Sequence, residues 1–347
     1  MKLSQFEPYK FQLEHHILNK PYEWSEFPCV LQIDISNHCG TQYSKIYCEY
    51  CWPQSKIVSG DWKYGEMPME QITWLLNQIG KYGKNMWYYT LFLNGDGLTD
   101  PRLPEILKLG KKLAPGIKNQ TFTCGTNPQN ADWLCTENLD WVCVTLSAPN
   151  SEIYKKVHRG NQFENVIKTM EYITEHRKSN QQLEVHYVIT QNNFGYMKDW
   201  YDFIGSKFPD WRRVFSPLVA SADNEPSKKA MGNLTLEQEE KAILTLDPNS
   251  KFWNTQTTGI RQPCVLWNNA AVTCDGFLLK CCNWSDYRLH NYGNIADYIK
   301  EGYSLKDFWM QRLANKHNNV LCRSCNLKHP QAKQRLSNIE VTAKVKR

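Results

Sequence analysis

The sequence contains no long apolar run and no strong excess of either charge. No stretch approaches the roughly 18 consecutive apolar residues that a membrane-spanning helix requires. The opening residues, MKLSQFEPYKFQLEHH, lack the apolar core of a signal peptide. The net charge is +6, and a hydrophobic fraction of 41% over 347 residues can supply a packed core. These features exclude collagen, coiled coils, membrane proteins and small secreted scaffolds. We expect a cytoplasmic protein with no membrane partner, built as two domains or as one large barrel with an appendage.

Cysteine, in contrast, is abundant, with 13 residues. An odd number in a chain without a signal peptide argues against a disulfide framework. Cys48 and Cys51 form one C-x2-C pair and Cys322 and Cys325 form another, and each pair can offer two thiolates to one metal centre. A zinc ribbon joining the pairs is the simpler alternative, but a long stretch of chain separates them and each has other cysteines nearer to it. We therefore predict two separate metal sites.

Short apolar segments alternate with amphipathic ones along most of the chain. The segments that read as strands are Val30–Ser36, Tyr88–Leu93, Gln120–Cys124, Trp141–Ser147, Leu183–Thr190 and Arg213–Val219. Helical spacing of apolar residues occurs in Met67–Gly80, Pro104–Leu113, Phe163–His176 and Leu234–Leu244. Successive β–α units imply a parallel sheet with crossover helices, whose ligand sites lie at the carboxyl ends of the strands. The polar residues after each strand are therefore the candidate site.

Three cysteines follow the first predicted strand. Cys39 is followed by eight residues and then by Cys48-Glu49-Tyr50-Cys51. Three thiolates close together, with an aromatic residue before the third, suit a 4Fe–4S cluster in which one iron stays open to a ligand carrying an amine and a carboxylate. Free thiols in a protein core are the alternative.

This loop resembles the motif of the radical SAM superfamily. The usual pattern is C-x3-C-x-aromatic-C after the first strand of a partial (β/α)6 barrel. Cys48 to Cys51 match its second half, whereas eight residues rather than three separate Cys39 from Cys48. The resemblance implies an α/β fold, with a partial (β/α)6 TIM-like barrel of the radical SAM type and a small C-terminal Fe–S domain. It also implies that an electron from a flavodoxin- or ferredoxin-like donor drives cleavage of S-adenosylmethionine to a 5′-deoxyadenosyl radical, which abstracts hydrogen from a substrate C–H bond.

Further resemblances mark the expected S-adenosylmethionine site. The run from Asn94 to Gly97 follows the second strand, where the family carries a GGEP-like stretch whose backbone binds the methionine amino group. Ser147 ends the fourth strand, as does a ribose-contacting serine in the family, although helix capping by Ser147, Asn150 or Ser151 is the alternative. The cofactor contacts that the resemblance implies are Tyr50, Asn94, Gly95, Asp96, Gly97, Asn127, Ser147, Thr190, Gln191 and Asn192.

The C-terminal cysteines resemble the SPASM signature of a subset of radical SAM enzymes. Cys264 precedes Gly276, Cys281 follows that glycine, and the Cys322–Cys325 pair lies downstream. Because no cysteine follows Cys325, the resemblance is to the shortened twitch version, which holds one auxiliary 4Fe–4S cluster. The implied ligands are Cys264, Cys281, Cys322 and Cys325. A structural zinc site with the same ligands is the alternative.

Some cysteines remain after the two predicted clusters. Cys124, Cys135 and Cys143 are interpreted as small core residues. Cys282 adjoins a predicted cluster ligand, and related enzymes place the neighbouring residues toward the substrate. Either Cys282 donates a hydrogen atom to a substrate radical, as epimerisation requires, or it replaces Cys281 as the ligand.

The motifs do not name the substrate. Relatives with SPASM-like tails most often modify peptides, so we predict a ribosomally made peptide that is epimerised, crosslinked or oxidised. A separate peptide-recognition protein is the expected partner, because residues 1–28 are too short for a recognition domain. Oxidation of a small metabolite, such as a sugar or nucleoside, is the second prediction. A zinc-dependent nucleic-acid-binding protein is a third, from another class, and would leave the three barrel cysteines unused; its contacts would be Arg212, Arg213, Lys228, Lys229 and the basic tail.

The predicted organisation follows from these segments. It comprises an N-terminal extension (1–28), the radical SAM partial barrel (29–225), a linker with a helix (226–260), the auxiliary cluster domain (261–330) and a basic tail (331–347). The polar segment 220–229 is typical of a linker.

Overall fold

The computed structural model describes residues 26–40, 47–218, 225–248, 269–279 and 291–314. Within these residues one sheet has the strand order β6-β5-β4-β3-β2-β1-β7-β8. All neighbouring pairs from β6 to β7 are parallel, and β8 is antiparallel to β7. The strands are β1 Val30–Ile33, β2 Tyr88–Thr90, β3 Lys118–Thr123, β4 Trp141–Thr145, β5 Gln182–Ile189, β6 Arg212–Pro217, β7 Asn269–Val272 and β8 Leu278–Leu279.

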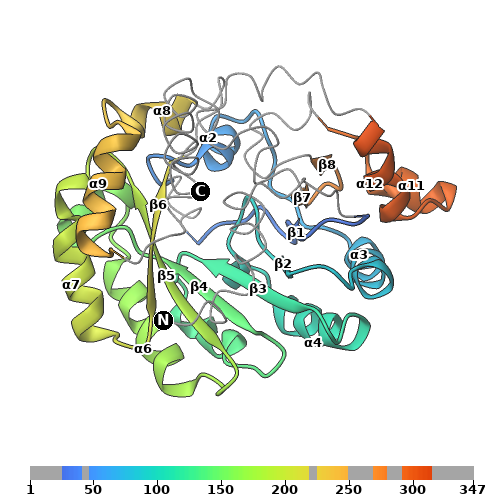
Figure 1. Cartoon of the computed structure of the whole chain (residues 1–347), viewed down its shortest axis with the longest axis horizontal. Helices are drawn as coiled ribbons and strands as arrows, with labels where there is room; N and C mark the ends of the chain where they lie inside the picture. The colour runs from blue at the N-terminus through green and yellow to red at the C-terminus, as the bar shows by residue number, and fades with distance from the viewer. Residues whose placement is uncertain (1–25, 41–46, 219–224, 249–268, 280–290, 315–347) are drawn as a thin grey trace, which may run out of the picture.

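Helices follow most of the strands, and most of them lie on the outer side of the curved sheet (Figure 1). The helices are α2 Trp52–Val58, α3 Met69–Tyr82, α4 Leu103–Leu113, α5 Ser151–His158, α6 Phe163–His176, α7 Met197–Lys207, α8 Glu225–Met231, α9 Leu236–Leu246, α11 Ile295–Glu301 and α12 Leu305–Ala314, with short 3-10 turns η3 Gly97–Thr99, η4 Pro128–Leu134 and η5 Phe194–Tyr196. The sheet stays open, with β6 and β8 at its edges. This architecture confirms the predicted α/β partial barrel. None of the described helices is long and apolar enough to cross a membrane.

The two faces of the sheet differ in polarity. Val142 and Val144 on β4, with Val185 on β5, point to the helices and are fully buried in the main core. Successive side chains of a strand point to opposite faces, so Cys143 and Glu184 point to the concave face. The outer face therefore carries the packing energy, and the concave face is free to carry polar groups.

The strands end earlier than the sequence predicts. β1 ends at Ile33 rather than at Ser36, and β4 ends at Thr145 rather than at Ser147. Ile35 and Leu146 are nonetheless buried, which is why the alternation of apolar and polar residues continues past the ladder. The extra residues belong to the loops that form the candidate site.

Two parts of the chain depart from their predicted character. The segment 220–229 is not all linker, because α8 begins at Glu225. Pro226 stands in the first turn of that helix, where the missing N–H is not needed. The described part of segment 261–330 adds strands β7 and β8 to the end of the main sheet, with β7 paired to β1. The domain boundary at 261 stays a prediction.

Candidate active site at the carboxyl edge of the sheet

The loops after β1 and β2 are in direct contact. Asp34 is fully buried and accepts hydrogen bonds from the backbone N–H of Asn94 at 2.9 Å and from its Nδ2 at 2.9 Å. Burial raises the pKa of Asp34 to about 7. A Cβ atom on Gly95 would lie 2.1 Å from the carbonyl oxygen of Ser36 and 2.5 Å from that of His38. Only glycine therefore fits at position 95 without moving the backbone.

Helix α2, which begins directly after Cys51, is tied to both loops. The buried Gln54 donates from Nε2 to the carbonyl of Asn37 at 2.9 Å and to that of Asn94 at 3.2 Å. Asn37 accepts in turn from the N–H of Gly65 at 2.8 Å and donates to the carbonyl of Lys63 at 3.0 Å. These amide contacts fix where the cysteine loop ends relative to the first two strands.

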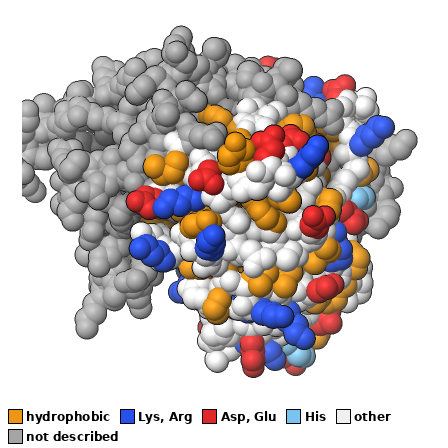
Figure 2. All heavy atoms as spheres, turned by 90° about the vertical axis from the view of Figure 1, so that its right-hand side faces the viewer, with side chains coloured by type: hydrophobic (Ala, Val, Ile, Leu, Met, Phe, Trp, Pro, Cys, Tyr) orange, Lys and Arg blue, Asp and Glu red, His pale blue; other side chains and the backbone are white. Residues whose placement is uncertain are grey.

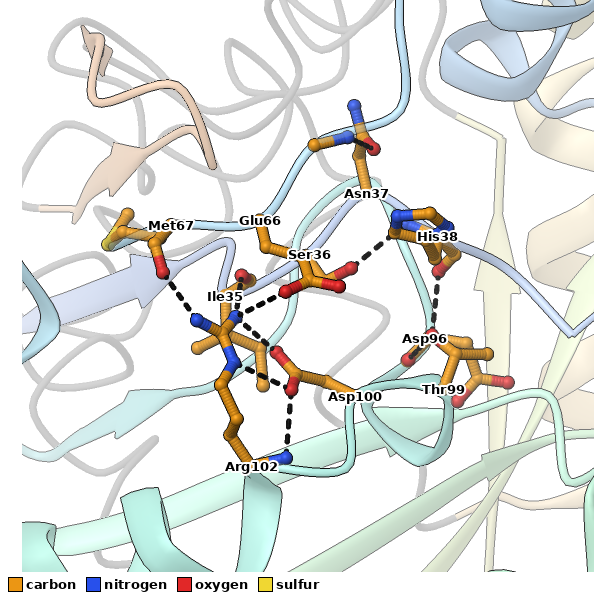
Figure 3. A network of polar contacts seen from close by, with 11 residues as sticks. Ile35, Ser36, Asn37, His38, Glu66, Met67, Asp96, Thr99, Asp100 and Arg102 are labelled. Atoms are coloured by element: carbon orange, nitrogen blue, oxygen red, sulfur yellow. Dashed lines mark hydrogen bonds and ion pairs between the residues drawn. The ribbon is translucent and has the colours of Figure 1, made fainter. Parts of the chain in front are cut away.

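An ion pair between Arg102 and Asp100 stabilises the same edge of the sheet, next to these loops (Figure 3). Arg102 donates from Nε and Nη2 to the two carboxylate oxygens of the buried Asp100, at 2.9 and 2.7 Å. The same guanidinium donates to the carbonyls of Met67 at 2.8 Å and Ile35 at 3.2 Å. The hydrogen bonds to the Asp100 carboxylate raise the pKa of Arg102 above its usual value. The pair thus fixes the end of the β1 segment against the start of α3.

The three predicted cluster thiols lie close together. Cys39, Cys48 and Cys51 are all half-buried. Burial, and then the neighbouring Cys39, raise the pKa of Cys51 to about 12. The pKa of Cys48 is raised by burial and then by both other cysteines. Three thiols that oppose one another's ionisation share one small space, and bound iron would reverse this effect because it stabilises thiolates. The residues therefore fit a 4Fe–4S cluster.

His158, at the end of α5, contacts one of these thiols. Its Nδ1 lies 3.2 Å from Cys48 Sγ, and its Nε2 accepts from the backbone N–H of Ser147 at 3.2 Å. Burial lowers the pKa of His158 to about 3, so the ring is neutral at physiological pH. Because Nε2 is an acceptor, the ring proton is on Nδ1 and points to the sulfur. The sequence analysis missed this residue, which lies 110 positions from Cys48.

Asp96 and Cys124 form a second contact at the same edge. Asp96 caps η3 by accepting from the N–H of Leu98 at 3.0 Å. Its other oxygen accepts from Cys124 Sγ at 2.6 Å and from the Cys124 N–H at 3.2 Å. Cys124 also hydrogen-bonds with the side chain of Cys39. The interpretation of Cys124 as a core residue is therefore wrong. Its position directly after β3 was the signal that could have placed it here.

The loops after β4 and β5 complete the edge. Ser147 is fully buried and its Oγ accepts from the N–H of Val188 at 3.0 Å. Asn193 donates to the carbonyl of Ser147 at 2.9 Å and accepts from the N–H of Thr190 at 2.7 Å. The helix-capping alternative falls to Asn150, whose side chain accepts from the N–H at the start of α5. Ser147 is thus a connection between strands rather than a cap.

The other predicted cofactor contacts lie around this edge. Asn192 donates from Nδ2 to Glu49 at 2.5 Å, which joins the β5 loop to the cysteine loop. The N–H of Gln191 donates to Ala230 at 2.8 Å, which brings α8 close. Tyr50 hydrogen-bonds with the side chains of Ser147 and Cys48, and burial raises the pKa of its phenol well above the usual value. Gly97 begins η3, and Asn127 immediately precedes η4.

Five predicted residues lie outside the part of the chain that the structure describes. They are Cys264, Cys281, Cys282, Cys322 and Cys325. The auxiliary cluster and the proposed hydrogen-atom donor therefore stay predictions. We call the described group at the strand ends the edge site; its members are Cys39, Cys48, Cys51, Asp96, Cys124, Ser147 and His158.

The comparisons with known proteins agree with this arrangement. A model of the radical SAM superfamily matches residues 37–204, which include the three cysteines and the edge-site loops. The chain contains a radical SAM domain. This match supports S-adenosylmethionine and one 4Fe–4S cluster as its cofactors. No curated protein sequence shows a significant match.

Solved structures with a similar fold include SuiB and anSMEcpe. Streptococcus suis SuiB, bound to S-adenosylmethionine, has a TM-score of 0.62 at 15% identity, and the alignment covers 94% of this chain and 75% of SuiB. The protein anSMEcpe, bound to AdoMet and a peptide named Cp18Cys, has a TM-score of 0.59 at 16% identity, with 92% and 99% covered. At these identities the likeness establishes the fold alone.

Three basic residues of the nucleic-acid alternative, Arg212, Arg213 and Lys228, have partners within the protein, and the basic tail lies outside the described residues. Arg212 pairs with Glu184 at 2.9 Å, and Lys228 pairs with Glu225 at 2.7 Å. Arg213 lies over the ring of Tyr201, 3.7 Å from its centroid. On the face shown in Figure 2, which is the side of α3 and α12 and not that of β6 and α8, basic and acidic side chains are interspersed. That face does not favour a phosphate backbone as partner.

Proposed function

We propose that this protein is a radical SAM enzyme that modifies a ribosomally made peptide. One observation carries the enzyme class: Cys39, Cys48 and Cys51 lie together at the strand ends, next to the glycine loop, inside the matched domain. The departure in spacing between Cys39 and Cys48 does not prevent the three thiols from sharing one space.

The residues of the edge site have separable roles in this proposal. When bound, the reduced cluster supplies the electron that cleaves S-adenosylmethionine into methionine and a 5′-deoxyadenosyl radical, which takes a hydrogen atom from the substrate. Gly95 lets the glycine loop pack directly against the backbone of the loop after β1, which sets where the loop's other backbone groups would meet the methionine part. Asp96 is buried and accepts from the N–H of Leu98 and from Cys124, so its role in this proposal is to hold the glycine loop against the end of β3.

The neighbouring groups orient the cluster and limit its surroundings. His158 donates a hydrogen bond to Cys48, which holds that thiolate in one orientation. Tyr50 places an aromatic ring between the cysteine loop and Ser147. Such packing excludes water and other hydrogen donors, which would quench a radical.

The peptide substrate is the finer part of the proposal. What supports it is the fold likeness to anSMEcpe, which was solved with a peptide bound, and the SPASM-like cysteine pattern of the C-terminal segment. We further propose an auxiliary cluster on Cys264, Cys281, Cys322 and Cys325, and a hydrogen-atom donor role for Cys282. A flavodoxin-like electron donor and a peptide-recognition protein would be the partners, in the cytoplasm.

Iron counting tests the enzyme class. After anaerobic reconstitution, we expect about eight irons per chain from two clusters, and about four when Cys39, Cys48 and Cys51 are all changed to Ala. Dithionite should drive release of 5′-deoxyadenosine by the wild type and not by the triple variant. Cys135→Ala is the matched control, because it removes a thiol outside the edge site. Cys135 is the C-terminal cap residue of η4, and its thiol contacts the carbonyl of Ala131. A wild type that binds iron but never cleaves S-adenosylmethionine would contradict the proposal.

Mass spectrometry tests the substrate. Short peptides encoded beside the gene are incubated with the reconstituted enzyme in D2O. A peptide that gains one deuterium has been epimerised, and one that loses two hydrogens has been crosslinked or oxidised. If no peptide changes but sugars or nucleosides are oxidised in the same assay, the metabolite alternative replaces the peptide while the radical SAM class stands.

A further inference from the structure

A second cluster of potential ligands lies on the concave face of the sheet, away from the edge-site loops. Cys143 on β4 and Glu184 and His186 on β5 place one ligand atom each within 4.8 Å of one another. His186 Nε2 lies 3.1 Å from Glu184 Oε2, and Cys143 Sγ lies 3.8 Å from the same oxygen. We call these three residues the interior cluster.

Strand register creates this cluster. Cys143 is paired with Glu184, and Thr145 with His186, so aligned side chains emerge on one face. Cys143 stands between two valines that enter the helix-covered core, which turns its own thiol to the opposite side. Cys143 is fully buried, as its interpretation as a core residue predicts, but its sulfur faces the amide of Gln120 and the carboxylate of Glu184.

The distances fit a tetrahedral cation. With bonds of about 2.3 Å to sulfur and about 2.0 Å to nitrogen and oxygen, ligand atoms of a tetrahedral zinc site stand roughly 3.3–3.5 Å apart. The observed separations of 3.1 and 3.8 Å lie on either side of this value. Thiolate, imidazole and carboxylate are also the three ligand types that zinc takes in proteins.

Each of the three ligands has an outer partner. Gln120 donates from Nε2 to Cys143 Sγ at 3.1 Å. Arg212 pairs with the other oxygen of Glu184 at 2.9 Å, and Ser216 Oγ lies 3.2 Å from His186 Nδ1. Outer partners of this kind orient metal ligands and leave one atom of each aimed inward.

Among the described residues, the interior cluster is most exposed at His186. The side chain of Glu184 is 3% exposed, whereas that of His186 is 14% exposed. Phe122 packs edge-on against the His186 ring, with centroids 5.0 Å apart, and forms an apolar wall beside it. With three protein ligands, the fourth position of a tetrahedral cation would be taken by water or a substrate atom, as in catalytic zinc sites.

From this geometry we infer that Cys143, Glu184 and His186 bind one divalent transition-metal cation of the zinc type. The site is distinct from the edge site, because its ligands come from the strands themselves and not from the loops. It can bind a nitrogen or oxygen donor of a molecule in the concave interior. The inference does not depend on the peptide proposal.

Metal counting on the cluster-loaded protein tests the inference. Reconstituted full-length protein is equilibrated with zinc at buffered free concentrations, desalted, and analysed for zinc and iron. Cys143→Ser, His186→Gln and Glu184→Gln are compared with Cys135→Ser, which changes a thiol outside both sites. We expect each variant of the interior cluster to bind one zinc ion fewer per chain than the wild type, with the same iron content. The control variant should bind as much zinc as the wild type.

The coordination shell gives a second readout. Zinc-edge X-ray absorption of the wild type should show sulfur near 2.3 Å together with nitrogen and oxygen near 2.0 Å, roughly as for mixed-ligand zinc. In His186→Gln, the signal from nitrogen and oxygen neighbours of zinc should decrease. Equal zinc in wild type, Cys143→Ser and His186→Gln, or a shell of sulfur alone, would overturn the inference. If Cys143→Ser does not fold, His186→Gln decides, because it changes the more exposed ligand.

Discussion

The edge site and the interior cluster use similar side chains but are built in different ways. At the edge, loops are fixed by backbone contacts: Asp34 binds Asn94, and Gly95 lies against the carbonyl of Ser36. In the interior, regular strand pairing places Cys143 beside Glu184. The edge therefore depends on a few special residues close in sequence, whereas the interior depends on register between strands. A loop site leaves a motif in the sequence, and a strand site does not.

The largest predicted effect concerns the buried carboxylate of the edge. Asp34 has a pKa of about 7 in the folded protein because burial disfavours its charge. The folded state thus holds a proton that the unfolded chain has lost, and stability falls as pH rises from about 4 through 7. The full contribution is on the order of 4 kcal/mol. Asp34→Asn should flatten this slope, measured by urea unfolding across that range.

A second buried carboxylate, that of Glu239, distinguishes an effect on stability from an effect on the geometry of the edge site. Burial also raises the pKa of Glu239 to about 7, and Glu239 lies on α9, outside the edge site. Glu239→Gln should flatten the pH slope similarly while leaving S-adenosylmethionine cleavage intact, whereas Asp34→Asn should impair it. Equal activity of the two variants would show that the contact between Asp34 and Asn94 does not shape the edge.

The next effect tests the backbone contact of the glycine loop. Gly95→Ala puts a Cβ atom 2.1 Å from the carbonyl of Ser36, so one loop must move. We expect a loss of about 2 kcal/mol in the free energy of unfolding, typical of overpacking, and weaker cluster retention at the edge. Gly116→Ala is the control, since a Cβ there meets nothing within 4 Å. If both variants unfold at the same urea concentration, the loops are looser than the structure shows. Zinc binding in the interior should survive in both.

Sequence reasoning reached the edge site because its residues follow strands. The helix at Phe163–His176 was predicted with the bounds that the structure shows, because its apolar residues keep helical spacing and are buried. Cys39, Cys48 and Cys51 were predicted from a short motif, and the structure brings them together. The strand ends were placed too late, because buried loop residues such as Ile35 continue the apolar pattern.

The same reasoning could not reach contacts that depend on distant segments. Cys143 stands between valines and looks apolar in sequence, and its neighbour Glu184 lies 41 positions away. Only the register between β4 and β5 reveals that the two share a face. His158 ends a helix and carries no signal of its own until α5 is packed beside the cysteine loop. Local sequence patterns predict helices and strands. Clusters of side chains from different strands and helices can be identified only once the assembled sheet is known.

A smaller effect should be confined to the interior. Ser216→Ala removes the hydroxyl that lies 3.2 Å from His186 Nδ1, while β6 and the three ligands stay in place. Loss of an outer partner weakens metal affinity by about 10-fold or more. Zinc titration of the cluster-loaded protein measures this change. Ser55→Ala is the control, because that hydroxyl bonds only the nearby carbonyl of Trp52 among the described contacts. An unchanged affinity would mean that Ser216 does not orient the imidazole.

The smallest effect is electronic and belongs to the edge. The Nδ1–H of His158 points to Cys48 Sγ, so it stabilises the sulfur more when the cluster has gained an electron. His158→Phe keeps the ring that stacks on Tyr154 at 4.3 Å and removes the donor. If the hydrogen bond stabilises the reduced cluster by about 1 kcal/mol more than the oxidised one, its loss lowers the one-electron reduction potential by about 40 mV. An EPR-monitored redox titration measures it, with the exposed His176→Phe as control. An unchanged potential in His158→Phe would show that the ring does not donate to the Cys48 sulfur. A lowered potential, with interior zinc unchanged, would show that the two sites are independent although they share one sheet.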